Sequence, residues 1–422
     1  MKLLFCICLM MGLLSMDVNA WEANYDEDKI PAYELPELLR MQDGSAVSTP
    51  DDWRTKRRPE LIRLFEEHVY GRMPGRPEGM AFELLESDGK ALEGKATRKQ
   101  IRVRLGKGVD GPAFDLLLFI PNHVKRPVPG FLGLNFFGNH SISADPKILL
   151  SQSWMRNNKD HHTVRNRATA ASRGTSSRRW PIERIIERGY ALGAIYYGDI
   201  DPDFHDGFKN GVHPLVDEAG GKRSGAAWGA ICAWAWGLSR GLDYLETDDD
   251  IDAARIAVIG HSRLGKTSLW AGATDERFAA AISNDSGCGG AALSRRCIGE
   301  TVWRINNSFP HWFCHNFRQY DNNESALPVD QHQLIALVAP RPVYVASAEK
   351  DRWADPKGEF LAALHADPVY RLLGLEGLPA TEMPSVDQPT VGRVGYHVRT
   401  GGHNLSPYDW EQYLDFMDRH VR

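Results

Sequence analysis

Ser262 stands where a short apolar segment meets a segment that can form a helix. The run Ile256-Ala-Val-Ile259 is rich in β-branched residues and ends at Gly260, and helix-compatible residues begin within three positions. The chain must therefore turn sharply at residues 261–263. A serine on such a strand-to-helix turn presents its hydroxyl beside free backbone N–H groups of the helix. The pattern predicts a nucleophilic serine, although Leu264 stands where Gly-x-Ser-x-Gly motifs have their second glycine.

A serine hydroxyl needs a base within hydrogen-bond reach, and that base needs a carboxylate to orient it. Where the serine lies on a strand-to-helix turn of this type, the chain order is serine, acid, histidine. The candidates for the base are therefore the histidines after Ser262, chiefly His311, His315, His332, His365, His397 and His403. We favour His403, because it follows a predicted strand, lies in a glycine-containing loop and precedes the last predicted helix.

Two aspartates are candidates for the acid. Asp351 follows a strand expected at 342–348, which is where an α/β-hydrolase usually keeps its acid. Asp285 follows the strand expected at 278–283, directly after the helix that Ser262 precedes. Either carboxylate could reach one imidazole, and the residue that does not is expected to cap a turn or a helix. The residues alone leave this choice open.

Two cations, Arg263 and Lys266, occupy the first turn of the helix expected after Ser262. Positive charges there oppose the positive end of the helix dipole, so a purely structural placement is unfavourable. Arg263 can offer its backbone N–H and its guanidinium to an oxyanion. Lys266 lies one helical turn from Ser262 and can reach oxygen atoms of a substrate. The alternative is that both are solvated surface charges.

The elements around these residues alternate in a way that favours one mostly parallel sheet. Antiparallel strands are expected at 96–105 and 114–120, before the alternation begins. The buried strands that follow are expected at 128–140, 190–199, 255–260, 278–283, 342–348 and 394–398, with helices that include 181–188, 224–246, 358–366 and one from Ser406. This order predicts the α/β-hydrolase fold, a three-layer sandwich around a doubly wound sheet.

Residues 1–20 have the features of an export signal, namely Lys2, an apolar run and small residues up to Ala20. We expect one domain over residues 21–422, with a helical extension at 21–78. The apolar run is short for a membrane span, and no later stretch reaches about 20 apolar residues. After cleavage of the signal, the mature protein is therefore expected to be periplasmic or secreted and not attached to a membrane. We also expect it to be a monomer.

Composition argues against several partners and cofactors. A formal net charge of −5 and a pI near 6.3 offer no basic surplus for nucleic acids or anionic membranes. The cysteines after the export signal lack the spacing of metal ligands, and we expect neither a metal nor any other cofactor. For these cysteines two states are expected, either four free buried thiols or one disulfide among them. The residues are Cys232, Cys288, Cys297 and Cys314.

Several motifs together resemble the glucuronoyl esterases, carbohydrate esterase family 15, in their bacterial form. The motifs are Gly260-His-Ser-Arg-Leu-Gly-Lys266, Asn284-Asp-Ser-Gly-Cys-Gly-Gly290, Asp351-Arg-Trp353 and Gly402-His403. The resemblance extends over nearly all of the mature chain. It implies an α/β-hydrolase that cleaves esters between lignin alcohols and the (4-O-methyl-)glucuronic acid groups of glucuronoxylan.

The resemblance also implies a role for each site residue. Ser262 would be the nucleophile, His403 the base and Arg263 the oxyanion stabiliser. The sugar ring would be held by Lys266, Glu300 and Trp353. Fungal members have a glutamate at the position of Asp285, whereas many bacterial members use the carboxylate at the position of Asp351. The shorter side chain of Asp285 favours Asp351, without excluding a shared role.

A second function of the same fold stays open at this point, that of an acetyl xylan esterase or another carboxylic ester hydrolase. Fold and triad do not separate the two, because function belongs to the site. A uronate site needs polar groups for several ring hydroxyls, while an acetyl site needs mainly a small pocket. Lys266, Glu300 and Trp353 are therefore the discriminating residues.

Overall fold

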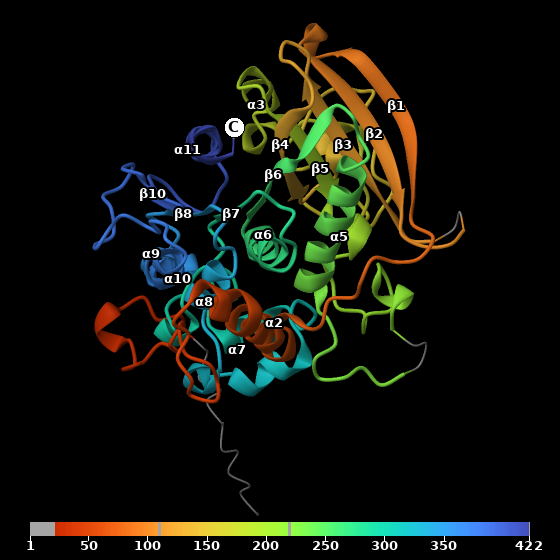
Figure 1. The fold of residues 1–422 in the computed structure, drawn as a ribbon. Coiled ribbons are helices and arrows are strands. Elements are labelled where there is room, and N and C mark those ends of the chain that lie inside the picture. The colour runs from red at the N-terminus through yellow and green to blue at the C-terminus, as the bar shows by residue number, and fades with distance from the viewer. Residues whose placement is uncertain (1–21, 109–110, 218–220, 422) are drawn as a thin grey trace, which may run out of the picture.

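The computed structural model describes residues 22–108, 111–217 and 221–421, so the predicted export signal lies outside the described residues. Within these residues ten strands form one sheet in the order β1-β2-β3-β5-β4-β6-β7-β8-β10-β9 (Figure 1). The strands are β1 (Ala81–Ala91), β2 (Ala96–Arg104), β3 (Ala113–Pro121), β4 (Val128–Asn135), β5 (Ala191–Tyr196), β6 (Ile251–His261), β7 (Ala280–Asn284), β8 (Val343–Ala348), β9 (Thr390–Val391) and β10 (Val394–Arg399).

The centre of the sheet is parallel, and its two edges are antiparallel. Strands β5, β4, β6, β7, β8 and β10 run in one direction. The antiparallel edges are β1, β2 and β3 on one side, where β3 pairs with β5, and β9 on the other. The carboxyl ends of neighbouring parallel strands therefore meet at one edge of the sheet, where the loops that follow them can assemble a site. The predicted mostly parallel sheet is confirmed.

Helices cover both faces of the sheet. One face packs against α3 (Ile182–Glu187) and α11 (Pro407–His420), and the other against α5 (Ala230–Leu245), α6 (Arg263–Thr274), α8 (Gln331–Ala336) and α9 (Pro356–His365) (Figure 1). Alternate residues of a strand enter opposite cores, as Phe131 and Leu132 of β4 do. This arrangement is the three-layer sandwich of the α/β-hydrolase fold. Three further helices lie in the connections: α4 (Tyr197–Ile200), α7 (Val302–Ser308) and α10 (Asp367–Leu372).

The N-terminal extension is less helical than predicted. Among residues 22–49 the only helical turn spans Glu27–Lys29, and the main helical stretch runs from α1 (Pro50–Asp52) through α2 (Arg58–Phe65) to Tyr70. Thr49 caps this stretch by accepting a hydrogen bond from the N–H of Asp52. Trp53, Leu61 and Phe65 are fully buried in the core under α6 and α8, so the helix is a packing element of the main domain.

The helix predicted at 224–246 begins later, at Ala230. Residues 224–227 form a separate turn, and Gly229 is extended. The N–H of Gly229 donates to the carbonyl of Tyr70, and that of Ala230 to the carbonyl of His311. All four cysteines after the export signal are free thiols. Of the two expected states, free thiols or one disulfide, the described residues therefore have free thiols.

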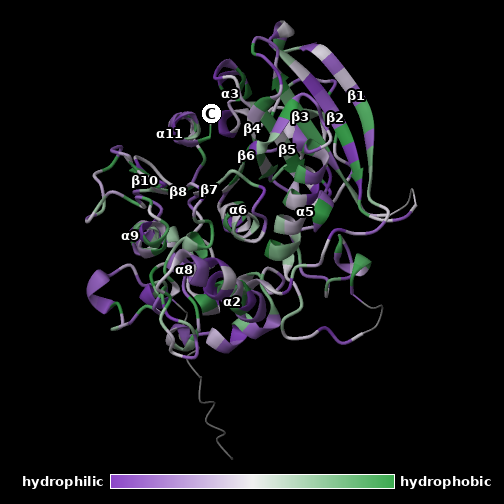
Figure 2. Cartoon of the chain, viewed as in Figure 1, coloured by the Kyte–Doolittle hydropathy of each residue, from purple (hydrophilic) through white to green (hydrophobic). Residues whose placement is uncertain are grey.

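Hydropathy follows this layering. In Figure 2 the strands at the centre of the sheet are largely green, whereas β1 at the open edge carries alternating purple and green bands. Strand β1 is correspondingly exposed along most of its length. Charged side chains on such an edge oppose pairing with another sheet. In the described part of the chain, no helix has both the length and the apolar character that a bilayer crossing requires.

Candidate active site

Ser262 occupies a strained turn between β6 and α6. Its φ of 59° and ψ of −130° lie outside the regions that most residues favour. Such a turn needs neighbours without side chains: a Cβ at Gly260 would lie 1.8 Å from the carbonyl oxygen of Leu264, and one at Gly265 would lie 3.0 Å from Cβ of Ser286. The glycine three residues after Ser262 therefore provides the close approach to the neighbouring loop.

Three side chains from three loops form a hydrogen-bonded chain. The hydroxyl oxygen of Ser262 lies 2.9 Å from Nε2 of His403, and Nδ1 of His403 lies 2.6 Å from Oδ2 of Asp351. Asp351 follows β8, and His403 lies between β10 and α11. Two backbone bonds hold these loops together, from the N–H of Glu349 to the carbonyl of Arg399 and from the N–H of Lys350 to the carbonyl of Gly401. The structure brings together the predicted nucleophile, base and one of the two candidate acids.

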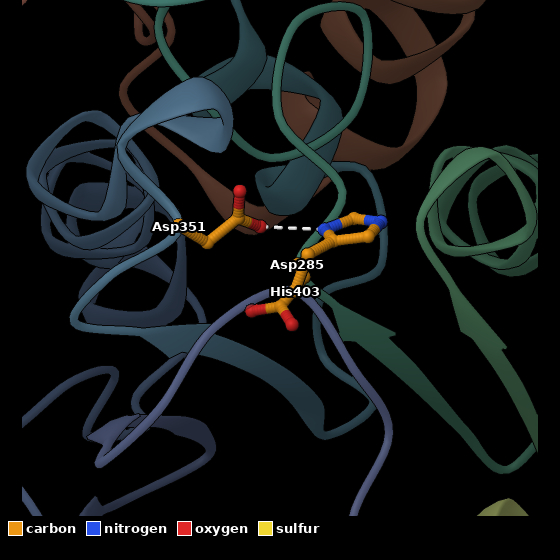
Figure 3. Close-up of side chains that lie close together, drawn as sticks. All are labelled: Asp285, Asp351 and His403. Carbon is orange, nitrogen blue, oxygen red and sulfur yellow. Dashed lines mark hydrogen bonds and ion pairs between the residues drawn. The ribbon is translucent and has the colours of Figure 1, made fainter.

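Asp285 lies beside this chain but makes different contacts. Its Oδ2 accepts hydrogen bonds from Nη2 of Arg399 at 3.2 Å and from the N–H of Asn404 at 3.1 Å. In Figure 3 the dashed line joins His403 to Asp351, while the carboxylate of Asp285 lies away from that contact. Burial, together with the nearby charge of Glu359, raises the pKa of Asp285 well above its ordinary value. On this geometry Asp285 holds the loop of His403, and Asp351 orients the imidazole.

The potential ligand atoms of Asp285, Asp351 and His403 all lie within 4.8 Å of one another, a spacing that a metal ion could bridge. The chemistry of the cluster fits a metal poorly. The guanidinium of Arg399 already approaches Asp285, and Nδ1 of His403 is engaged by Asp351. A cation placed there would face that guanidinium. The prediction that no metal is needed stays a prediction.

Arg399 links the loop of His403 to the core. Its Nε donates to both carboxylate oxygens of Asp409, at 2.8 and 3.0 Å, and its remaining nitrogens bind the carbonyl oxygens of Thr400, Gly402 and Asn404. Asp409 is fully buried in the first turn of α11, where it also caps that helix. One buried arginine thus fixes the backbone on both sides of His403.

Arg263 projects from the first turn of α6 into a polar and aromatic environment. Its Nη1 donates to Oδ2 of Asp203 at 2.6 Å, and its guanidinium carbon lies 4.9 Å from the ring centroid of Trp312. The backbone N–H of Arg263 is among the first of α6, which have no acceptor within the helix. Two positive donors, the guanidinium and the helix start, are therefore placed next to Ser262.

One pocket, with a volume of about 340 Å³, is lined by all eight residues predicted from the sequence. Besides Ser262, Arg263, Asp285, Asp351 and His403, these are Lys266, Glu300 and Trp353. Lys266 is buried, and its Nζ donates to the carbonyl of Ser286 at 2.6 Å and lies 3.4 Å from Oε2 of Glu300. Trp353 is 36% exposed, which places its indole at the rim. The pocket thus has a charged, hydrogen-bonding interior and an aromatic edge.

A buried glutamate supports the wall of this pocket. Oε1 of Glu359, from α9, accepts hydrogen bonds from the N–H groups of Ser286 at 2.8 Å and Gly287 at 2.9 Å, and Ser347 donates its hydroxyl to Oε2. Burial raises the pKa of Glu359 to about 7. The segment that offers its carbonyl to Lys266 is therefore held from behind by a carboxyl group whose charge varies near neutral pH.

Sequence reasoning did not single out several residues that shape the site. Asp203 and Arg399 each anchor a predicted residue, Glu359 supports the wall, and Phe136, Phe309 and Trp312 surround Arg263. Asp203 and Arg399 could have been considered, because both stand close to the carboxyl end of a buried parallel strand. The aromatic residues lie in or next to irregular stretches, where periodicity carries no signal.

Comparisons with known proteins agree with this geometry. A family model described as fungal glucuronyl esterase matches residues 223–374. Carbohydrate esterase MZ0003, from an unknown prokaryotic organism, is 51% identical over 405 residues, which cover 94% of this chain and 92% of that protein. A solved structure of a promiscuous CE15 esterase from a marine bacterial metagenome superimposes with a TM-score of 0.88 at 51% identity, covering 94% of this chain and all of the other.

The glucuronoyl esterase from Solibacter usitatus gives a TM-score of 0.89 at 45% identity, again covering 94% of this chain and all of the other. Identity at this level over nearly the whole chain leaves no room for a different fold. The chain therefore belongs to carbohydrate esterase family 15, the glucuronoyl esterases.

Proposed function

We propose that this protein is an exported serine esterase that hydrolyses esters between (4-O-methyl-)glucuronic acid groups of glucuronoxylan and lignin alcohols. The observation that carries the proposal is the joining of two features in one pocket: a Ser262, His403 and Asp351 chain and a buried Lys266 and Glu300 pair. The first suits acyl transfer, and the second suits the hydroxyl groups of a sugar acid. A relative with 45% identity is named a glucuronoyl esterase.

Acylation would begin when the hydroxyl oxygen of Ser262 attacks the uronoyl carbonyl carbon. The serine proton passes to Nε2 of His403, and Asp351 stabilises the imidazolium through Nδ1. Negative charge develops on the former carbonyl oxygen, where the guanidinium and backbone N–H of Arg263 receive it. When the bond to the alcohol breaks, His403 returns its proton to the departing alcohol oxygen and leaves a uronoyl ester on Ser262.

Deacylation would repeat these steps with water. His403 takes a proton from a water molecule, whose oxygen attacks the acyl carbon of the Ser262 ester. The second tetrahedral intermediate collapses, the proton passes from His403 to the serine oxygen, and the uronic acid is released and loses its carboxyl proton to solvent. One water molecule balances the hydrolysis, and His403 carries the proton in each half-reaction.

The sugar would be held by the polar and aromatic residues of the pocket that the acyl transfer does not use. Lys266 presents a buried ammonium and Glu300 a buried carboxylate, with side chains 4% and 7% exposed. Such a pair can bind neighbouring hydroxyls, one as donor and one as acceptor, without a large change in solvation. Trp353 at the rim offers a flat apolar surface to the face of a sugar ring.

The test compares two substrates under identical conditions. Hydrolysis of benzyl glucuronate and release of acetate from an acetylated xylo-oligosaccharide are measured with the protein and with Ser262→Ala as the blank. The proposal requires serine-dependent release of benzyl alcohol with a much higher kcat/KM than release of acetate. A preference for the acetylated oligosaccharide would instead assign the protein to the acetyl xylan esterases.

A further inference from the structure

Asp203 is a buried carboxylate that none of the proposed chemical steps uses. It lies in the segment after α4, and its side chain is 1% exposed. Its Oδ1 faces Nε2 of His311 at 2.9 Å and Nε1 of Trp312 at 2.8 Å. Its Oδ2 accepts from Nη1 of Arg263 at 2.6 Å and from the hydroxyl of Tyr197 at 3.1 Å. Both oxygens are thus saturated by donors from three different segments of the chain.

The guanidinium of Arg263 is confined on its other sides by aromatic rings. Its central carbon lies 4.9 Å from the ring centroid of Trp312, 5.4 Å from that of Phe136 and 5.8 Å from that of Phe309. Its Nε is buried and has no protein acceptor among the described residues. The rings favour the cation but leave it free to slide across their faces. Directional contacts come from the hydrogen bond to Asp203 at 2.6 Å and from the neighbouring hydroxyl of Tyr197, and Asp203 is the one that carries the opposite charge.

We propose that Asp203 is the positioning residue for Arg263, fixing its guanidinium where the oxyanion forms while His311 and Trp312 fix the carboxylate. The inference rests on the proposed function, because it assigns Arg263 to the oxyanion. Stabilisation of an oxyanion depends on donors that are already in place, since the gain is lost when they must reorganise. A shift of about 1 Å in such a group is enough to lower a rate substantially.

The charge state of the pair supports a permanent anchor. Burial alone would raise the pKa of Asp203, but the hydrogen bond from His311 and the charge of Arg263 hold it below its ordinary value. Burial alone would lower the pKa of Arg263, and the neighbouring Asp203 raises it instead. Both groups are therefore charged throughout the range in which an esterase is assayed, so the anchor does not switch with pH.

Asp203→Asn tests this contact with little other disturbance. The amide oxygen can take the place of Oδ1 and still accept from His311 and Trp312. The amide nitrogen then takes the place of Oδ2 and presents N–H groups to Nη1 of Arg263, where two donors repel each other. Tyr197 can turn its hydroxyl to accept from that nitrogen. The substitution therefore breaks mainly the contact with Arg263.

We expect kcat for benzyl glucuronate to fall roughly 10- to 100-fold in Asp203→Asn, a part of what removal of one oxyanion donor costs, with KM changed by less than about twofold. The loss should be the same across the pH range of activity. The matched control is Asp201→Asn, two residues earlier, which is also buried but lies 3.3 Å from His213. We expect its kcat to stay within about twofold of the parent protein.

A double-mutant cycle with Arg263→Gln separates positioning from a general structural effect. If Asp203 acts through Arg263, adding Asp203→Asn to Arg263→Gln changes kcat by less than about twofold. An equal loss in both backgrounds, or an unchanged kcat in the single variant, overturns the inference. Should Asp203→Asn not fold, Asp203→Glu retains the charge but displaces the carboxylate, and the same cycle applies to it.

The same cycle is also measured with p-nitrophenyl acetate as the substrate. This separates a wrong substrate assignment from a wrong role for Asp203. The oxyanion forms at the same place for any ester, so the anchor should matter for this substrate too. If the protein cleaves p-nitrophenyl acetate but no glucuronate ester, the proposed substrate is wrong, and the cycle on the acetate ester still decides the role of Asp203.

Discussion

Nδ1 of His403 lies 2.6 Å from Oδ2 of Asp351, while the carboxylate of Asp285, in the same cluster, is bound to Arg399 and to the N–H of Asn404. The two aspartates therefore differ in what they touch, although both lie near the imidazole. An aspartate bonded to the Nδ1 of a catalytic histidine sets its tautomer and stabilises its protonated form. An aspartate bonded to a loop sets only where that loop lies.

The two aspartates should therefore differ in their effect on catalysis. Asp351→Asn should lower kcat by about 10³- to 10⁴-fold, because an amide at that position favours the wrong tautomer of His403. Asp285→Asn should cost at least about tenfold less, because its amide oxygen can still accept from Asn404. Steady-state kinetics on benzyl glucuronate measure both. The reverse order of the two losses would make Asp285 the principal acid.

Trp353 should contribute to binding of the sugar and little to the chemical step. Trp353→Ala is expected to raise KM for benzyl glucuronate about tenfold and to leave kcat within about threefold. Because the indole is at the rim, its removal should not disturb folding. With p-nitrophenyl acetate the variant should match the parent protein. A loss of kcat on both esters, with KM unchanged, would place Trp353 in the catalytic machinery instead.

Lys266 and Glu300 must be tested together, since removing one leaves a buried charge without its partner. The double variant Lys266→Met with Glu300→Gln should fold and should lose at least about 100-fold in kcat/KM for benzyl glucuronate, while kcat/KM for p-nitrophenyl acetate changes by less than about fivefold. Selective loss on the uronate ester is the signature of a sugar subsite. An equal loss on both esters would argue that the pair is structural.

The turn of Ser262 should depend strongly on Gly260. A methyl group there would overlap the carbonyl of Leu264, so Gly260→Ala should lower the free energy of unfolding by more than about 3 kcal/mol or prevent soluble expression. Gly89→Ala is the matched control, because nothing lies within 4 Å of a Cβ at that position. Its effect should stay below about 1 kcal/mol. Denaturant titration provides both values, and a tolerant Gly260 would contradict the described turn.

Glu359 should make stability depend on pH near neutrality. Its pKa is about 7 in the folded protein against an ordinary 4.5, so the folded state binds the proton more tightly. The cost of ionising it is fully present above pH 7, declines as the pH falls and is absent below 4.5. It amounts to at most about 3 kcal/mol. Because Glu359→Gln removes this cost, the variant should gain clearly more stability relative to the parent protein at pH 8 than at pH 5.

Thermal unfolding of the parent protein and of Glu359→Gln, each at pH 5 and pH 8, measures how the difference in their stability changes with pH. The amide oxygen can accept from Ser286 and Gly287, and the amide nitrogen can donate to Ser347, so the wall of the pocket should persist. A larger gain at pH 5 than at pH 8 would reverse the assignment of a raised pKa to Glu359.

The parts of the fold that could be predicted are those with a local signal. Strand β6, Gly260 and the start of α6 form a pattern within a dozen residues, and alternating strands and helices indicate a parallel sheet. The predictions were less accurate where long-range contacts decide the conformation. Gly229 and Ala230 donate to the carbonyls of Tyr70 and His311, so the helix begins at Ala230, and no local propensity encodes those partners.

The site shows the same division. Six of the predicted pocket residues were within reach because motifs or strand ends mark them, whereas the roles of Glu300 and Trp353 rested on the family resemblance alone. The choice between Asp285 and Asp351 depended on the hydrogen bond between Arg399 and Asp285. These two residues are 114 positions apart in the sequence. Asp203 and Arg263 are separated by 60 residues and follow β5 and β6, two strands that lie on either side of β4. Such pairs follow from the three-dimensional arrangement alone.

The central claim is that Ser262 carries the uronoyl group between two half-reactions, and partitioning of that intermediate tests it most directly. Methyl glucuronate and benzyl glucuronate are each turned over in water containing ethanol, and the ratio of ethyl glucuronate to glucuronic acid is measured. A common acyl-enzyme predicts the same ratio from both esters and no products from Ser262→Ala. A ratio that changes with the departing alcohol would contradict the acyl-enzyme and, with it, the role of Ser262.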